Sequence, residues 1–342
     1  MASCFHDDAV ASMHIPDGVL SPAVCLATGA VSIGAVGYSL RQLNQAASTR
    51  TVPLTSMLAA FLFAGQMVNL PLPGLPISGH LLGGVIAGVI LGPWAGCVAL
   101  TLVLVVQCLL FADGGLLVLG ANILHISVVG CLGSYAVYSL IRNRFQNPER
   151  GVLWGTVVAA WLSVMAAAFL FCVEFAVSHA GSEYNLRRVF GLMIVLHAVI
   201  GIGEAVISGL LIRFVQQQKP ELIFSPQNSS PVAGLTRVIT AGLLAALAVA
   251  AFLAPLASSY PDGLEAVASR TGFDAIEQDN PQLVLTDYEI PFLSRHGWTR
   301  VSVGLAGIGG TLVVLLFGFL LNFMTRAAPD PAPSGSSVVE NV

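Results

Sequence analysis

Charged residues are scarce in this chain. Only 9% of its 342 residues are Asp, Glu, Lys or Arg, whereas soluble domains carry about 25%. Hydrophobic residues make up 56%, so the charges are too few to cover a folded surface in water, and a soluble globular protein is excluded. With only 14 Lys and Arg residues and a net charge of −4, the chain also lacks the basic surface that nucleic-acid binding requires.

Several motifs of enzymes and cofactor sites are missing as well. None of the six cysteines forms a C-x-x-C pair, so we expect them to pack as small apolar side chains. The chain has no H-E-x-x-H zinc-protease motif and no G-x-x-x-x-G-K-[ST] phosphate loop, so it cannot itself supply an ATPase. We therefore predict no enzymatic activity and no intrinsic cofactor.

Long apolar runs dominate the chain instead. A helix needs about 20 predominantly apolar residues to cross a bilayer. Nine candidate spans are present, at about 21–40, 53–70, 80–93, 94–111, 117–141, 152–177, 190–214, 235–257 and 299–324. The third and fourth are short and meet near Pro93, so we expect bent or incomplete spans there. The fold class predicted is an all-α integral membrane protein: a polytopic bundle of about seven helices, then two C-terminal transmembrane helices flanking an extracytoplasmic loop.

Changes in composition predict the domain organisation. The segments are a solvated leader or a start assigned too early (1–12), a membrane domain (13–215), a cytoplasmic linker (216–234), a two-helix segment (235–326) and a disordered tail (327–342). The loop 258–297 within the two-helix segment is rich in Asp and Glu, and we interpret it as an acidic solvated loop or one that attracts cations.

The distribution of Lys and Arg predicts the orientation. With an extracytoplasmic N-terminus, nine of the 14 basic residues fall on the cytoplasmic side, which is the side they favour. We therefore expect a multi-pass protein of a bacterial or archaeal cytoplasmic membrane with residue 13 near the outer face.

Ionisable and amide side chains within or beside the apolar runs are the candidate functional residues, because such groups are costly in lipid. His80 follows a segment rich in proline and glycine and is predicted to lie at the same outer mouth as His14. The others, which could support a site or line a path, are Gln107, Asn122, His125, His197 and Glu204. Each of these five can equally be a structural hydrogen-bonding group.

The dipeptide Met13-His14 offers a specific metal chelate. If Met13 is the true N-terminus, its α-amine, the His14 amide nitrogen and the His14 Nδ1 can close fused rings around one ion, and His80 can supply a fourth nitrogen. A planar nitrogen set suits Ni(II) or Cu(II), and deprotonation of the amide makes binding weaken as the pH falls. Pro16 and Gly18 would turn the chain back into the bundle, with Asp17 bonding nearby backbone amides.

Five ordered motifs resemble the CbiM/NikM family, the substrate-capture subunits of energy-coupling-factor transporters for cobalt and nickel. They are "MHIPDGVLSP" (13–22), "SGHLLGG" (78–84), "LGPWAG" (91–96), "VVQCLLFADGGLLVLGAN" (105–122) and "HAVIGIGEAVIS" (197–208). The segment "PLASSYPDGLEAVASRTGF" (255–273) is similar to the small partner subunit with its PDGLE signature, fused here as in NikMN-type proteins.

The resemblance implies a helical bundle that binds Ni(II) or Co(II) near its outer face. Its ligands would be Met13, through the amine, His14, through backbone nitrogen and imidazole, and His80. Transport would be driven by a membrane coupling subunit (CbiQ/NikQ type) and a separate cytoplasmic ATPase (CbiO/NikO type). The chain departs from the family pattern in its twelve residues before Met13 and in His125, where an amide is expected.

The polar residues in the apolar spans are also compatible with two other function classes. A secondary, proton-coupled metal transporter could relay protons through His197 and Glu204, which lie two helical turns apart on one face. An intramembrane serine protease could use Ser78 and His197 as a dyad, although Pro76 stands where that signature has glycine.

Overall fold

The structure is a computed structural model that describes residues 13–46, 51–225, 233–278, 285 and 288–324. The predicted leader 1–12 and tail 327–342 lie outside these residues.

Seven helical stretches within the described part of the chain are long and apolar enough to cross a membrane. They are α1 (Pro22–Ala46), α4 (Pro93–Phe111), α5–η1–α6 (Leu119–Ile123, Leu124–Gly133, Ser134–Arg142), α7 (Pro148–Ser178), α8 (Leu186–Gln218), α9 (Leu235–Ala248) extended by η3 (Val249–Leu253) and η4 (Ala254–Leu256), and α12 (Thr299–Met324). The short η2 (Pro220–Leu222) follows α8. The predicted all-α membrane bundle is confirmed.

Two further helices are shorter. α2 (Thr51–Gln66) has 16 residues and α3 (Gly84–Leu91) has eight, which gives α3 a length of about 12 Å. The expectation of an incomplete third span is therefore confirmed. The same expectation for the fourth is wrong, because Pro93 stands in the first turn of α4, where its missing N–H is not needed, and the helix continues for 19 residues.

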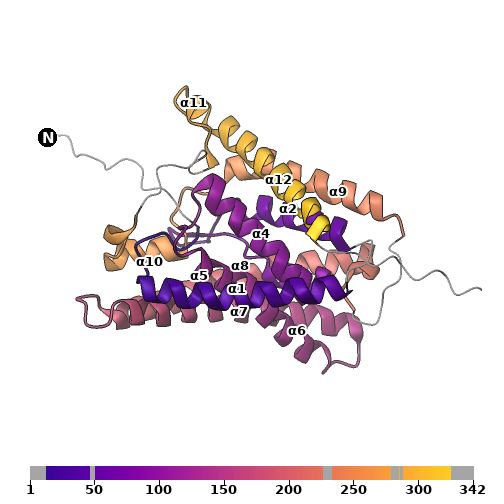
Figure 1. Cartoon of the computed structure of the whole chain (residues 1–342), viewed down its shortest axis with the longest axis horizontal. Helices are drawn as coiled ribbons and strands as arrows, with labels where there is room; N and C mark the ends of the chain where they lie inside the picture. The colour runs from indigo at the N-terminus through magenta and orange to yellow at the C-terminus, as the bar shows by residue number, and fades with distance from the viewer. Residues whose placement is uncertain (1–12, 47–50, 226–232, 279–284, 286–287, 325–342) are drawn as a thin grey trace, which may run out of the picture.

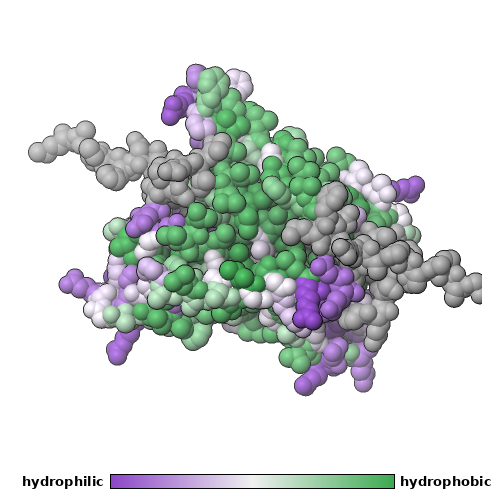
Figure 2. Space-filling view, in the orientation of Figure 1, coloured by the Kyte–Doolittle hydropathy of each residue, from purple (hydrophilic) through white to green (hydrophobic). Residues whose placement is uncertain are grey.

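The helices form one bundle with an apolar exterior. α7 and α8 pack as an antiparallel pair, α1 lies along α4 and α5, and α2 packs against α12, α9 and α4 (Figure 1). Green, hydrophobic side chains cover the middle of the molecule in Figure 2, and purple, hydrophilic ones lie toward its two ends. Leu26 and Phe252, each more than 70% exposed, belong to this apolar exterior, which suits contact with lipid.

A π-helix interrupts the span between residues 119 and 142. η1 (Leu124–Gly133) packs against α3 so closely that a Cβ on Gly84 would overlap the backbone of Gly130. π-helical segments are rare and occur often at functional sites. This one begins beside His125.

The loop between α9 and α12 folds back onto the bundle. It contains α10 (Gly263–Thr271), η5 (Asp274–Ile276) and α11 (Pro291–Ser294). Asp262 and Glu265 form a capping box that fixes the start of α10, and the side chains of Val267 and Phe273 are fully buried. A purely solvated loop is therefore wrong, because this segment covers the end of the bundle that carries residue 13. A two-stranded pair, β1 (Leu70–Pro71) and β2 (Ser78–Gly79), lies beside it and leads directly into His80.

Candidate metal site

The segment 13–18 enters the bundle rather than lying on its surface. Met13, His14 and Ile15 are all buried. The Asp17 carboxylate accepts the backbone N–H groups of residues 116, 117 and 118 at 3.0, 2.9 and 3.2 Å, as its predicted role required. A Cβ on Gly18, at φ 90°, would overlap the carbonyl oxygen of Ile276, so this turn needs glycine.

Asn122 anchors the same segment from α5. Its Oδ1 accepts the Ile15 N–H at 3.0 Å, and its Nδ2 donates to the Ile15 carbonyl at 3.1 Å. Gly115 donates its backbone N–H to the same carbonyl, and a Cβ at Gly115 would overlap Asp17. The expectation that Asn122 supports the site is consistent with this two-way hydrogen bond.

Asp113, in the turn after α4, was missed by the sequence-based prediction. Its Oδ1 accepts the Met13 N–H at 3.0 Å and lies 2.8 Å from His14 Nδ1, while its Oδ2 accepts the hydroxyl of Tyr288 at 2.6 Å. Burial alone would raise the pKa of this carboxyl, but His14 and the hydrogen bonds from His14 and Tyr288 outweigh burial and hold the pKa below its usual value. An aspartate directly after a buried span, in the motif "FADGG", was the available signal.

His80 faces His14 across the site. The two ring centroids are 5.7 Å apart, and His80 Nε2 lies 3.2 Å from the Met13 carbonyl oxygen. Burial, followed by the neighbouring His14, lowers the pKa of His80. The ring is therefore held in the neutral form that binds metal ions.

Glu204 and Gln107 do not line the site. Glu204, on α8, accepts the N–H groups of Leu82 and Gly83 at 2.8 and 3.0 Å, so it fixes the segment that carries His80. The Gln107 side chain is buried with no hydrogen-bond partner among the described residues, and only its backbone carbonyl reaches Asp113 N. Gln107 lies within α4 and does not line the cavity, so its predicted role in supporting the site or lining a path stays a prediction.

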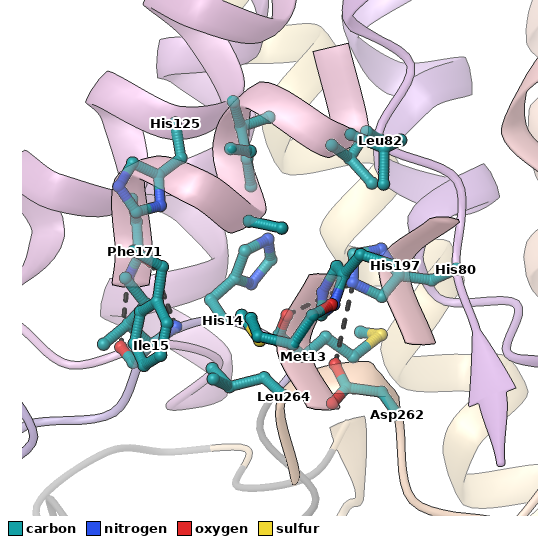
Figure 3. Close-up of a pocket in the computed structure, with 16 residues that line it drawn as sticks. Met13, His14, Ile15, His80, Leu82, His125, Phe171, His197, Asp262 and Leu264 are labelled. Carbon is teal, nitrogen blue, oxygen red and sulfur yellow. Dashed lines mark hydrogen bonds and ion pairs between the residues drawn. The ribbon is translucent and has the colours of Figure 1, made fainter. Parts of the chain in front are cut away.

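Four histidines line one cavity of about 90 Å³: His14, His80, His125 and His197 (Figure 3). His197 Nδ1 lies 2.9 Å from the Met193 carbonyl oxygen, four residues earlier on α8, and His125 Nε2 lies 2.9 Å from Glu174 Oε2. Most of the remaining wall is apolar, and α7 contributes four of its residues. His197 and Glu204 thus have different hydrogen-bond partners, and a relay between them stays a prediction.

The loop before α10 supplies a carboxylate to this cavity. Asp262 lies below His80 in Figure 3, with its Oδ2 3.9 Å from His80 Nε2 and its Oδ1 accepting the Glu265 N–H. Burial, together with the nearby Asp113, raises the pKa of Asp262 to about 7. Gly263 packs against the His197 ring with no room for a Cβ. Asp262, like Asp113, was missed as a site residue although it stands in the recognised PDGLE motif.

Ser78 has a structural role. Its N–H donates to the Pro261 carbonyl at 2.8 Å, and its hydroxyl donates to the Tyr260 carbonyl at 2.7 Å. These bonds tie β2 to the loop and commit the hydroxyl proton to a carbonyl rather than to His197. A serine-protease dyad is therefore not formed.

Side chains alone do not provide a complete ligand set in the described part of the chain, where no three His, Cys, Asp or Glu residues are placed to hold one ion. Backbone nitrogens can complete it. The nitrogen of Met13 and the Nδ1 of His14 both lie within 3.0 Å of Asp113 Oδ1, so they converge on one point beside His80. The arrangement can therefore offer nitrogen ligands to a small cation in a cavity with mostly apolar walls.

Comparisons with known proteins identify the family of the chain. Residues 14–222 match the CbiM family, described as the cobalt uptake substrate-specific transmembrane region, and residues 236–327 match the PDGLE domain. The chain is 33% identical to the putative fused nickel transport protein NikMN of Archaeoglobus fulgidus, over 92% of this chain and all of the relative. It is 29% identical to the probable fused nickel transport protein LarMN of Lactiplantibacillus plantarum, over 89% and 96% of the two chains.

A solved structure extends the similarity to the fold. The crystal structure of a truncated transition metal transporter matches with a TM-score of 0.52 and 31% identity, over 60% of this chain and 98% of that one. The chain therefore belongs to the CbiM family of substrate-specific transmembrane proteins, with a PDGLE domain joined to its C-terminal side.

Proposed function

We propose that this protein captures Ni(II) or Co(II) at the extracytoplasmic face of the cell membrane as the substrate-specific subunit of an ATP-driven importer. His14 and His80 are its principal ligands. The observation that supports this proposal best is that Met13 N and His14 Nδ1 both lie within 3.0 Å of Asp113 Oδ1. His80 Nε2 lies beside them, 3.2 Å from the Met13 carbonyl oxygen.

The ligand chemistry favours these metals. Imidazole and backbone nitrogen suit late divalent transition ions, and a planar nitrogen set is typical of Ni(II). Two relatives named as nickel transport proteins align with 92% and 89% of the chain, and a putative cobalt transport protein aligns with 62% of it. Both metals therefore remain candidate substrates, and the ion is cargo rather than a resident cofactor.

The energy for transport would be supplied by other protein subunits. The sequence contains no phosphate loop, so ATP hydrolysis would come from a CbiO/NikO-type ATPase acting through a CbiQ/NikQ-type membrane subunit. The excess of Lys and Arg on the opposite side of the membrane supports an extracytoplasmic site. In this proposal the domain boundaries are those of the sequence, 13–215 for capture and 235–326 for the covering segment.

Metal binding by the purified protein tests the site. His14→Ala and His80→Ala are each expected to abolish high-affinity binding of Ni(II) and Co(II) while the helical bundle stays folded. His179→Ala is the matched control, because His179 bonds the Val19 carbonyl outside the cavity. Unchanged binding by both site variants would refute the assignment.

Uptake measurements separate this function from a proton-coupled transporter. Cells that carry the protein together with its coupling and ATPase subunits are expected to lose uptake when the ATPase is inactivated. Uptake that persists without the ATPase and stops when an ionophore removes the proton gradient would favour the secondary transporter.

A further inference from the structure

A second pair of metal-binding side chains adjoins the cavity. His125 lies at the start of η1 and lines the cavity, and its Nε2 is 2.9 Å from Oε2 of Glu174 on α7. His125 is 6% exposed and Glu174 5%, and both belong to membrane-spanning stretches. The pair is therefore shielded from solvent on elements separate from those that carry His14 and His80.

These two side chains are close but not hydrogen-bonded. His125 Nε2 and both carboxylate oxygens of Glu174 have no hydrogen-bond partner among the described residues. A buried polar group left unsatisfied costs about 1–3 kcal/mol, and more when it is charged. Ionisable residues inside a membrane are retained mainly where they act on an ion, a proton or a substrate.

The observed separation fits two ligands on one metal ion. Transition metals bind imidazole nitrogen and carboxylate oxygen at about 2.0–2.2 Å, so two such atoms at right angles on one ion are about 3 Å apart. The 2.9 Å between Nε2 and Oε2 meets this requirement without movement.

We propose that His125 and Glu174 form a second, weaker position for a divalent transition-metal ion, reached through the cavity that contains His14 and His80. No third His, Cys, Asp or Glu joins them within the residues that the structure describes, so the protein supplies two ligands. Water can complete the coordination on the side of His125, because His125, unlike Glu174, lines a cavity of about 90 Å³, which exceeds the roughly 10–15 Å³ that one water needs. Two protein ligands explain why this position is the weaker one.

This inference extends the proposed function, and the two can fail separately. The experiment measures Co(II) bound per full-length chain in detergent by equilibrium dialysis and elemental analysis over a range of Co(II) concentrations. Wild-type protein is expected to show a tight component and a weaker one. His80→Ala is expected to remove the tight component and leave the weaker one.

The Glu174→Gln variant tests whether the Glu174 carboxylate is a ligand of the weaker position. It keeps the side-chain volume but removes the anionic ligand, so the weaker component is expected to disappear while the tight one stays. Glu149→Gln, in the first turn of the same helix and exposed, is the matched control and is expected to keep both components. Equal binding by Glu174→Gln and Glu149→Gln at every concentration would overturn the proposal.

His125→Gln provides an independent test on the other ligand, with His179→Gln as its control. Loss of the weaker component in His125→Gln alone supports the proposal, and retention of that component in His125→Gln overturns it. If His80→Ala leaves the tight component intact, the capture proposal fails, while the comparison of Glu174→Gln with Glu149→Gln still decides the second position.

Discussion

His14 Nδ1 lies 2.8 Å from Asp113 Oδ1, although 99 positions separate the two residues. Both side chains are almost fully buried. Asp113 therefore fixes the orientation of the imidazole, and a metal ion bound at Nδ1 must replace this contact. The carboxylate then remains beside the ion as a buried negative charge, still bonded by Tyr288.

Asp113→Asn is expected to weaken Ni(II) or Co(II) binding about 10–100-fold. Freeing His14 from a charged hydrogen bond favours the ion by about 1.5–3 kcal/mol. Loss of the carboxylate charge outweighs this gain, because a divalent ion about 4 Å from one negative charge gains up to about 8 kcal/mol at an effective dielectric constant of 20. Isothermal titration of the purified protein measures the effect.

The control for this change is Asp274→Asn, which alters an exposed aspartate of the same formal charge. It is expected to bind metal as the wild type does. Tighter binding by Asp113→Asn would show that Asp113 competes with the ion rather than supporting its site.

Tyr288→Phe is expected to weaken metal binding by a smaller factor, about tenfold. The change removes the hydroxyl that bonds Asp113 at 2.6 Å but keeps the aromatic ring, which stacks on Phe111 with centroids 4.6 Å apart. A hydrogen bond to a charged group contributes about 1.5–3 kcal/mol, part of which water can replace. Faster metal release in stopped-flow chelator exchange is the measurement.

Tyr260→Phe serves as the matched control, because Tyr260 is half exposed and contributes its backbone carbonyl, not its hydroxyl, to Ser78. Equal release rates for the two variants would show that the segment after α10 does not act on the site through Tyr288.

Glu204→Gln is expected to lower the stability of the protein by about 1–3 kcal/mol and to weaken metal binding as well. Glu204 accepts two backbone N–H groups, from Leu82 and Gly83, and an amide replaces one of its acceptor oxygens with a donor. The segment that carries His80 then loses one anchor. Thermal unfolding in detergent, with and without Ni(II), measures both effects.

Glu183→Gln, in the exposed connection between α7 and α8, is the control and is expected to change neither quantity. If Glu204→Gln lowered metal-dependent uptake while binding and stability stayed normal, Glu204 would act in proton movement instead of positioning His80.

Hydropathy was sufficient to predict the membrane bundle, because the thickness of the bilayer sets the length of each apolar run. Hydropathy and Pro93 also predicted a short third span, but they placed its start at residue 80, whereas α3 starts at Gly84, because Leu81 and Leu82 before it are apolar as well. The π-helix from Leu124 to Gly133 also has no periodic signal in the sequence, and neither does the close approach of Gly84 to Gly130 across it.

Local motifs identified His14 and His80, because M-H and S-G-H each present a recognisable ligand near a predicted membrane surface. Asp113, Asp262 and Tyr288 were missed because their function depends on contacts between distant segments. The Tyr288 hydroxyl donates a hydrogen bond to Asp113, although 175 positions separate the two residues. The pattern of residues within either segment does not predict that hydrogen bond. The capping role of Asp262 was readable from "PDGLE", but its position beside His80 required the loop to fold over the bundle.

A chain that starts at Met13 is expected to bind Ni(II) at least tenfold more tightly than the full chain. In the full chain the Met13 nitrogen is a peptide N–H that donates to Asp113 at 3.0 Å, whereas a free α-amine there can join the His14 amide and imidazole in fused chelate rings. Ligation by the amide must release its proton, and the amine, with an ordinary pKa of about 7.7–8.0, releases part of another at pH 7. Calorimetry in buffers of different ionisation enthalpy counts these protons.

The control is the same shortened chain with one alanine before Met13, which restores a peptide bond at that nitrogen and is expected to remove the gain in affinity. Equal affinity and equal proton release in the two shortened chains would exclude the Met13 amine as a ligand and leave the imidazoles of His14 and His80 as the nitrogen donors.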